Sequence, residues 1–275
     1  MEMVGQMRNK SQVMTWKEED NLPRTLILSG SRGSGKRVLA SYIAEQFGFD
    51  VRWVGNKVND VRDMILDCRS LSKPTMFVFV GADDMSLSAK NSLLKVTEEP
   101  PNDAYFVIPL EDVSSTLATI KSRSIEMQME PYTKEQLRLF VKGEFPKDEL
   151  CLEIANNPGE LIELEKLGVD NLVEIVEKVI DNIFDVGCGN ALNIAKNIKF
   201  KDEDEGYDLG VFWRVLNNRL VYRLYENILK FTMSQVKEYT DFMLVTQEFL
   251  NRLNNPSYNR KMLFDMWVLA LRKEV

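Results

Sequence analysis

The chain of 275 residues contains no histidine, and its three cysteines, Cys68, Cys151 and Cys188, lie far apart. Neither a CxxC pair nor any other metal-ligand spacing connects them. This argues against a zinc site and against any mechanism that needs a histidine base. We therefore expect no zinc and no other metal site, and three buried or half-buried free thiols in a reducing, cytoplasmic setting.

Long apolar runs are also missing from the sequence. No stretch of about 18 apolar residues occurs, so we expect no membrane span. Residues 1–10 carry charge but no apolar segment, so they do not resemble a secretory signal. The formal net charge is −7, which argues against DNA binding as the sole role but leaves room for a local basic strip.

The first 130 residues alternate short apolar segments with helical periodicity. A short helix at 7–17, on a solvated lead-in, comes first. The expected strands lie at 24–29, 51–54, 76–80 and 104–110, and the expected helices at 38–47, 58–70, 87–97 and 116–122. Such alternation is typical of an α/β domain with a parallel sheet.

After Pro131 the periodicity is almost entirely helical. Helices are expected at 134–145, 148–155, 159–167 and 172–185 and onward to the end of the chain, with a break at 156–159 and an exposed acidic loop at 202–206. We therefore predict three domains: an α/β core at 1–130, a small helical domain at 131–170 and a helical domain at 171–275.

A glycine-rich loop separates the first expected strand from the helix that follows it. Its predicted nucleotide-binding residues are Gly30, Gly33, Gly35, Lys36 and Arg37. The spacing GxxxxGK between a strand and a helix is that of a phosphate-binding loop, in which the lysine reaches the β- and γ-phosphates. Arg37, however, stands where a serine or threonine would hold Mg²⁺. Two alternatives stay open: ATP or ADP bound without efficient turnover, or a structural turn that holds no nucleotide.

The segment at 86–101, SLSAKNSLLKVTEEPP, resembles the NALLKxLEEPP stretch of the AAA+ clamp-loader subunits, the gamma/tau and delta-prime proteins of DNA polymerase III. The segments TIKSRS at 119–124 and NPGEL at 157–161 resemble two further family motifs. The resemblance runs from about residue 24 to 168. It implies an α/β AAA+ core with a parallel sheet, a small helical lid and an all-α C-terminal collar domain for oligomerisation.

The departures from this family concern hydrolysis. Aligned with the family, Val80 and Gly81 take the places of the two Walker B acids, and Leu110 takes the place of a polar phosphate sensor. The lid turn has no basic sensor, and the four-cysteine zinc module is missing. Little remains for phosphoryl transfer except Lys36, unless Asp83 or its neighbour Asp84 serves as a metal ligand.

The family places an arginine finger where this chain has Arg123. The resemblance thus implies catalysis in trans by a non-hydrolysing, delta-prime-like subunit that braces the ring. The implied partners are the clamp-loader ATPase subunits and a delta-like subunit, and indirectly the sliding clamp and primed DNA. Arg123 could instead merely cap a helix or pair with a surface carboxylate. A weakly active ATP-binding ATPase and an AAA+-derived scaffold outside replication remain alternatives.

Three further patterns are interpreted as structural. Glu98 and Glu99, just before two prolines, are expected to end a helix. An apolar face is expected at Phe212, Trp213, Leu216, Leu220 and Leu224. The basic residues between them, Arg214, Arg219 and Arg223, suit a solvated face better than a track along a DNA backbone.

Overall fold

A computed structural model of the chain describes residues 3–101, 103–141, 151–152, 154–167, 169–181, 209–253 and 260–271. The chain divides into two compact units, Met1–Val141 with Asn156–Glu160, and Lys142–Ala155 with Leu161–Val275. The domain boundaries after residues 130 and 170 remain predictions. Cys188 and the acidic stretch at 202–206 lie outside the described residues. Within the described ranges, every helix is too short or too polar to span a membrane.

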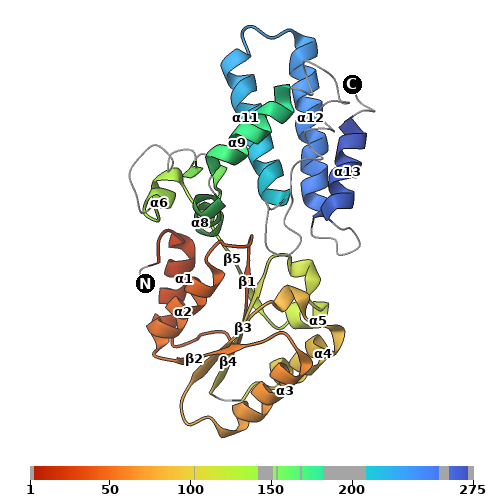
Figure 1. Ribbon diagram of the computed structural model, residues 1–275. Helices are drawn as coiled ribbons and strands as arrows, with labels where there is room; N and C mark the ends of the chain where they lie inside the picture. Colours follow the sequence, from red (N-terminus) through yellow and green to blue (C-terminus); the bar gives the residue numbers. More distant parts are fainter. Residues whose placement is uncertain are drawn as a thin grey trace. The chain divides into compact units, whose positions relative to one another are not determined.

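A five-stranded sheet forms the centre of the first unit (Figure 1). Its strands are β1 (Thr25–Ser29), β2 (Asp50–Val54), β3 (Thr75–Phe79), β4 (Ala104–Leu110) and β5 (Ile125–Gln128). They run in the order β2-β3-β4-β1-β5, and every pairing is parallel. The predicted α/β class with a parallel sheet is confirmed. β5 was not predicted from the sequence, because it lies at the edge of the sheet and three of its four residues are exposed.

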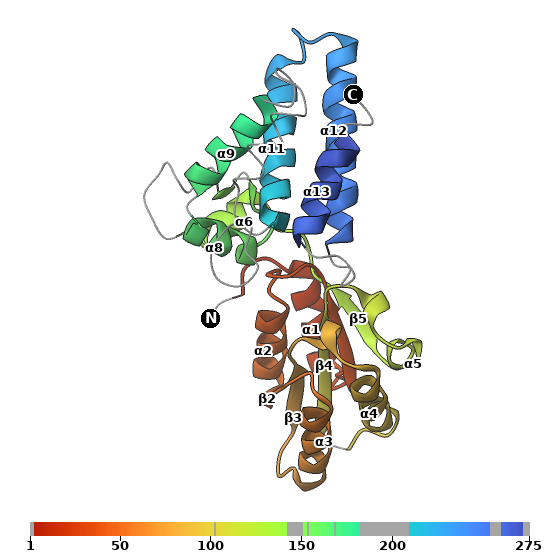
Figure 2. The same cartoon turned by 45° about the vertical axis from the view of Figure 1, so that its right-hand side comes forward.

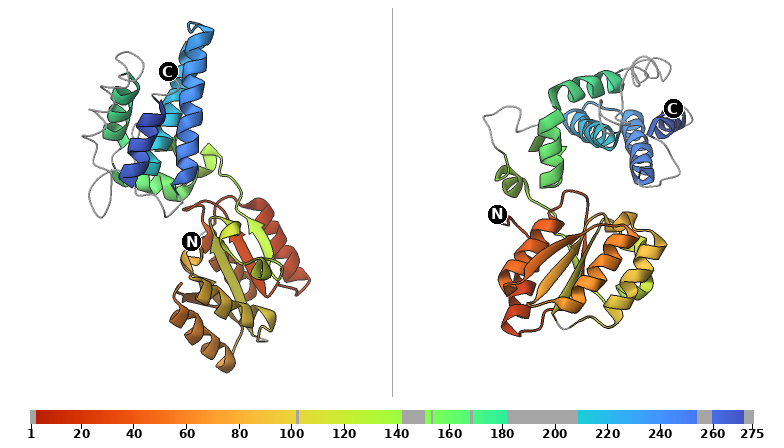
Figure 3. Two further views of the ribbon diagram at one scale, coloured as in Figure 1. Left: turned by 90° about the vertical axis from the view of Figure 1, so that its right-hand side faces the viewer. Right: turned by 60° about the horizontal axis from the view of Figure 1, so that its bottom comes forward.

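Helices cover both faces of this sheet, as Figure 2 and the right-hand view of Figure 3 show. One face is covered by α1 (Met7–Glu18) and α2 (Lys36–Phe47). The other is covered by α3 (Val58–Asp67), α4 (Leu87–Glu98) and α5 (Ala118–Lys121). Successive side chains of a strand point to opposite faces: Phe77 packs on the face covered by α3 and α4, and Val78 on the face covered by α1 and α2. The central strands are therefore buried on both sides.

The expectation of a solvated lead-in at residues 7–17 is wrong, because α1 is part of the core. Its Val13 and Trp16 are buried against the sheet. The carboxylate of Glu130, beyond β5, accepts hydrogen bonds from the amides of Arg8 and Asn9 at 2.7 and 3.2 Å. A carboxylate at the N-terminus of a helix satisfies free amides and complements the helix dipole. These hydrogen bonds therefore join the start of α1 to the segment after β5.

The described part of the second unit is helical, which agrees with the helical C-terminal region predicted. Its helices include α9 (Val169–Asp181), α11 (Leu209–Asn227), α12 (Met233–Arg252) and α13 (Arg260–Leu271). Trp213 and Trp267 are buried at its centre, and the Trp267 indole N–H donates to the Thr246 hydroxyl at 3.1 Å. The predicted apolar face is confirmed for Phe212, Trp213, Leu216 and Leu220, and Leu224 is half-buried.

Candidate functional site

The glycine-rich loop lies where the sequence predicts it, between the carboxyl end of β1 and the start of α2. Gly33 and Gly35 have φ angles of 82° and 93°, a region that residues with a Cβ rarely adopt. Gly35 is the N-cap of α2, and Arg37 is exposed in its first turn. The loop therefore has the strand-turn-helix setting of a phosphate site.

Lys36 is held by the loop itself. Its ammonium group donates to the carbonyl oxygens of Gly30 and Ser31 at 2.5 and 2.9 Å. Burial lowers the pKa of Lys36, and the negative charges of Glu111 and Asp83 partly oppose this shift. The lysine that would meet phosphates thus faces acidic side chains and is satisfied by its own backbone.

Asp83, one of the two acids named above as alternative metal ligands, forms hydrogen bonds around the end of β4. Both of its carboxylate oxygens accept the Glu111 amide at 3.0 Å, and one also accepts the hydroxyl of Ser115 at 3.1 Å. Val80, directly after β3, and Leu110, the last residue of β4, bring no polar side chain to the carboxyl ends of these strands. Asp83 therefore joins the end of β4 to the 3₁₀ turn η3 (Val113–Ser115).

A second segment of the first unit lies against the loop. Asn157 is the N-cap of α8 (Pro158–Leu167), because its side-chain oxygen accepts the Glu160 amide at 3.0 Å. The Asn157 side-chain nitrogen donates to the Ser31 hydroxyl at 3.2 Å. The Gly159 amide donates to the Gly33 carbonyl at 3.1 Å. The sequence predicts a turn here but not its contact with the loop.

These residues do not fit a magnesium nucleotide. Mg²⁺ in such sites takes a loop hydroxyl and an acid at the end of the neighbouring strand. Here Arg37 replaces the hydroxyl, and Asp83 accepts hydrogen bonds from the backbone amides of Glu111 and Asp112. In the part of the chain that the structure describes, no group of three or more Cys, Asp or Glu residues could hold a metal ion.

Arg123 lies near the amino ends of the parallel strands, whereas the loop follows the carboxyl end of β1. It precedes β5 by two residues, and Ile125 of β5 pairs with Leu26 of β1. Gly30 follows Leu26 by four residues. At roughly 3.3 Å per residue, these four residues cover about 13 Å along the strands, and Arg123 lies in the turn before β5 starts. Arg123 therefore cannot reach the chain's own loop.

The Arg123 side chain is 39% exposed and has two partners in the structure. One terminal nitrogen donates to the Thr119 carbonyl at 2.9 Å, and the other lies 3.3 Å from the Glu98 carboxylate. The expected structural role of Glu98 at the end of α4 thus includes a contact with Arg123, since α4 and α5 lie side by side. Exposed pairs of this kind are weak, so another anion could replace Glu98.

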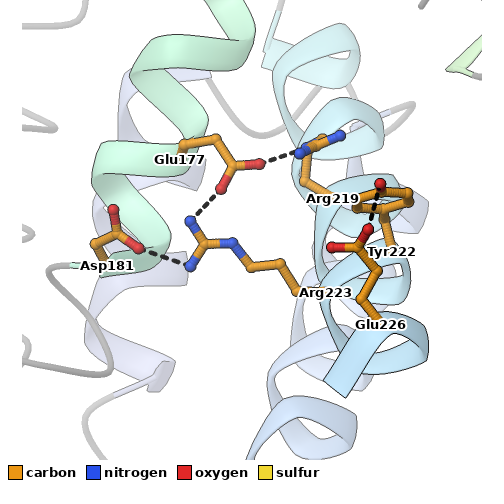
Figure 4. Close-up of polar contacts among 6 residues, drawn as sticks. All are labelled: Glu177, Asp181, Arg219, Tyr222, Arg223 and Glu226. Carbon is orange, nitrogen blue, oxygen red and sulfur yellow. Dashed lines mark hydrogen bonds and ion pairs between the residues drawn. The ribbon is translucent and has the colours of Figure 1, made fainter. Parts of the chain in front are cut away.

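The basic residues of α11 do not form a solvated face as expected. Arg219 and Arg223 both pair with Glu177 of α9, and Arg223 also pairs with Asp181 at 2.6 Å (Figure 4). The two arginine side chains are only 19% and 24% exposed. Burial alone would lower the pKa of Arg223, but its hydrogen bond to Asp181 and the charge of Glu177 outweigh this and raise it. These arginines join two helices, and their charge is already compensated.

The strand order and the phosphate-type loop give the first unit the fold of an AAA+ α/β core. Residues 54–133 match the family described as "DNA polymerase III, delta subunit". The chain is 32% identical to DNA polymerase III subunit delta' of Bacillus subtilis over 112 residues, 40% of this chain and 33% of the relative. It is 29% identical to the delta' subunit of Haemophilus influenzae over 117 residues, 41% of this chain and 35% of the relative.

The fold agrees with these matches. A DNA polymerase III gamma subunit-related protein from Thermotoga maritima superposes with a TM-score of 0.52 at 19% identity, covering 95% of this chain and 99% of that one. The resemblance to AAA+ clamp-loader subunits that the sequence predicts is thus confirmed. The chain spans less than half the length of the curated relatives that it matches.

Proposed function

We propose that this chain is a delta-prime-like subunit of a replication clamp loader that does not hydrolyse ATP itself and supplies Arg123 to a neighbouring subunit. The observation that carries the proposal is the exposed position of Arg123, at the end of the strands opposite to its own phosphate loop. An arginine that acts on phosphate from this position must act in another subunit. In well-studied phosphoryl-transfer enzymes, such an arginine is worth roughly 10³- to 10⁵-fold in rate.

The same proposal assigns a passive role to the chain's own loop. Val80, Gly81 and Leu110 stand at the strand ends where hydrolysis needs polar groups, and Asp83 is engaged by backbone amides. Phosphoryl transfer depends on positioned charge, so any ATP or ADP held here would not turn over. The proposed partners are clamp-loader ATPase subunits and a delta-like subunit, which together load a sliding clamp on primed DNA.

The test is to mix this chain with the clamp-loader ATPase subunit encoded in the same genome and to measure the mass and ATPase rate of the complex. Arg123→Ala should leave the mass unchanged and lower kcat at least about 100-fold at the site that Arg123 serves. Arg138→Ala, which removes an exposed arginine of α6 (Lys134–Arg138), is the control and should keep the full rate.

Three results would contradict the proposal. A complex whose ATPase is unaffected by Arg123→Ala would remove the catalytic role in trans. No association at micromolar concentration would favour a scaffold role outside replication. ATP turnover by the isolated chain that is lost in Lys36→Ala would instead favour the weak-ATPase alternative.

A further inference from the structure

The carbonyl and hydroxyl oxygens of the loop accept hydrogen bonds from other groups of the same chain. A loop that binds phosphate directs backbone N–H donors at the anion. Here the loop accepts hydrogen bonds from the chain's own donors. The donor–acceptor pairs are Lys36 to the carbonyls of Gly30 and Ser31, Asn157 to the Ser31 hydroxyl, the Gly159 amide to the Gly33 carbonyl, and the Tyr132 hydroxyl to the Ser34 carbonyl.

Two glycines make the closest part of this contact. A Cβ added to Gly159 would lie 2.3 Å from the Cα of Gly33, and a Cβ added to Gly33 would lie 2.7 Å from the Cα of Gly159. Both distances are far below any real contact between carbon atoms that are not bonded, and a Cβ on Gly33 would also lie 2.6 Å from the side-chain oxygen of Asn157. The two segments can therefore approach this closely only because both positions are glycine.

The closed arrangement leaves one loop group unsatisfied. Ser34 is 5% exposed, and among the described residues its hydroxyl has no hydrogen-bond partner. An unpaired buried hydroxyl carries a cost, which the contacts of the turn at 157–159 must offset. The acids Glu111 and Asp83 near Lys36 add a negative potential that disfavours an incoming anion.

We infer that the turn Asn157–Gly159 is an internal ligand of the phosphate loop, so that this contact and a bound diphosphate exclude each other. We call the contact of residues 157–159 with residues 31–33 the clasp. The start of α8 is then coupled to the loop: an anion binds only in molecules whose clasp is open, and its apparent affinity falls by the fraction that is open. This inference goes beyond the proposed function and does not depend on Arg123.

The test uses the full chain and inorganic pyrophosphate as the probe, with binding measured by calorimetry. Gly159→Ala should open the clasp by steric overlap. It adds no backbone strain, because Gly159 is not among the positive-φ glycines. Asn157→Ser should weaken the clasp while its hydroxyl still caps α8. Ile162→Ala, at an exposed position of the same helix, is the matched control, since it also raises helix propensity without touching the loop.

We expect Gly159→Ala and Asn157→Ser to bind pyrophosphate at least about tenfold more tightly than the parent chain and than Ile162→Ala. Adding Lys36→Ala to either variant should abolish this gain in affinity. Hydrogen exchange at the Gly159 amide should be slow in the parent chain and fast in Gly159→Ala. Two outcomes would overturn the inference: clasp variants with unchanged circular dichroism that bind no more tightly, or a parent chain that binds pyrophosphate while the Gly159 amide stays protected. If Gly159→Ala fails to fold, Asn157→Ser carries the same comparison.

Discussion

Replacing Asp83 with asparagine tests whether the acid after β3 stabilises the structure or serves as a metal ligand. Its two oxygens accept the Glu111 amide, and one of them also accepts the Ser115 hydroxyl. Asparagine keeps one accepting oxygen and turns an NH₂ group toward these donors, so at least one hydrogen bond to a charged group is lost. Such a bond contributes about 1.5–3 kcal/mol. Because Asp83 is partly buried, we expect the free energy of unfolding of the first unit to fall by about 2 kcal/mol.

Asp84 provides the matched control. It lies in the same 3₁₀ turn, η2 (Ala82–Asp84), and is exposed. Asp84→Asn removes the same charge near the same turn, so we expect a change within about 0.5 kcal/mol. Urea unfolding followed by circular dichroism measures the difference. Hydrogen exchange of the β4 amides assigns it to the first unit, since β4 is the strand whose end Asp83 holds.

Two results would refute this reasoning. If both variants change the stability by the same small amount, the Asp83 hydrogen bonds contribute nothing beyond a surface charge. If Asp83→Asn instead abolishes an ATP turnover that Asp84→Asn retains, then Asp83 serves the nucleotide, and the loop is a working site.

Two further predictions concern burial and charge. Glu177→Gln should destabilise the second unit by about 2 kcal/mol in a urea titration, because Arg219 and Arg223 would lose their shared, partly buried carboxylate. The control is Glu174→Gln, which removes an exposed acid of the same helix and should have no measurable effect. Burial raises the pKa of the Cys68 thiol from 9.0 to about 11, so at pH 8 the fraction of thiolate is about 100-fold lower in the native protein than in the unfolded chain. In a variant whose only cysteine is Cys68, the native thiol should therefore react with disulfide reagents at pH 8 about 100-fold more slowly than the unfolded chain. The folded pKa lies above the unfolded one, so the stability that this thiol contributes is present below pH 9 and lost as the pH rises from 9 to 11. A native thiol that reacts as fast as the unfolded chain would refute the raised pKa of Cys68.

Much of the first unit could be predicted from sequence because its signals are local. The apolar run at 76–80 and the strand at 104–110 are buried on both faces, which is the pattern that a central parallel strand produces. Cys68 of the first unit and Cys151 of the second are buried, as predicted. β5 was missed because an edge strand of four residues, with three of them exposed, has too little pattern to detect.

The sequence by itself determined the α/β class, the helical C-terminal region, the position of the glycine-rich loop and the resemblance to clamp-loader subunits, since each depends on residues close together in the chain. Only the tertiary structure decided which groups meet. It brought Gly159 onto Gly33, engaged Asp83 with the amides after β4 and paired Glu177 with two arginines of α11. The residues in these contacts lie between 28 and 126 positions apart, so no local periodicity carries information about them.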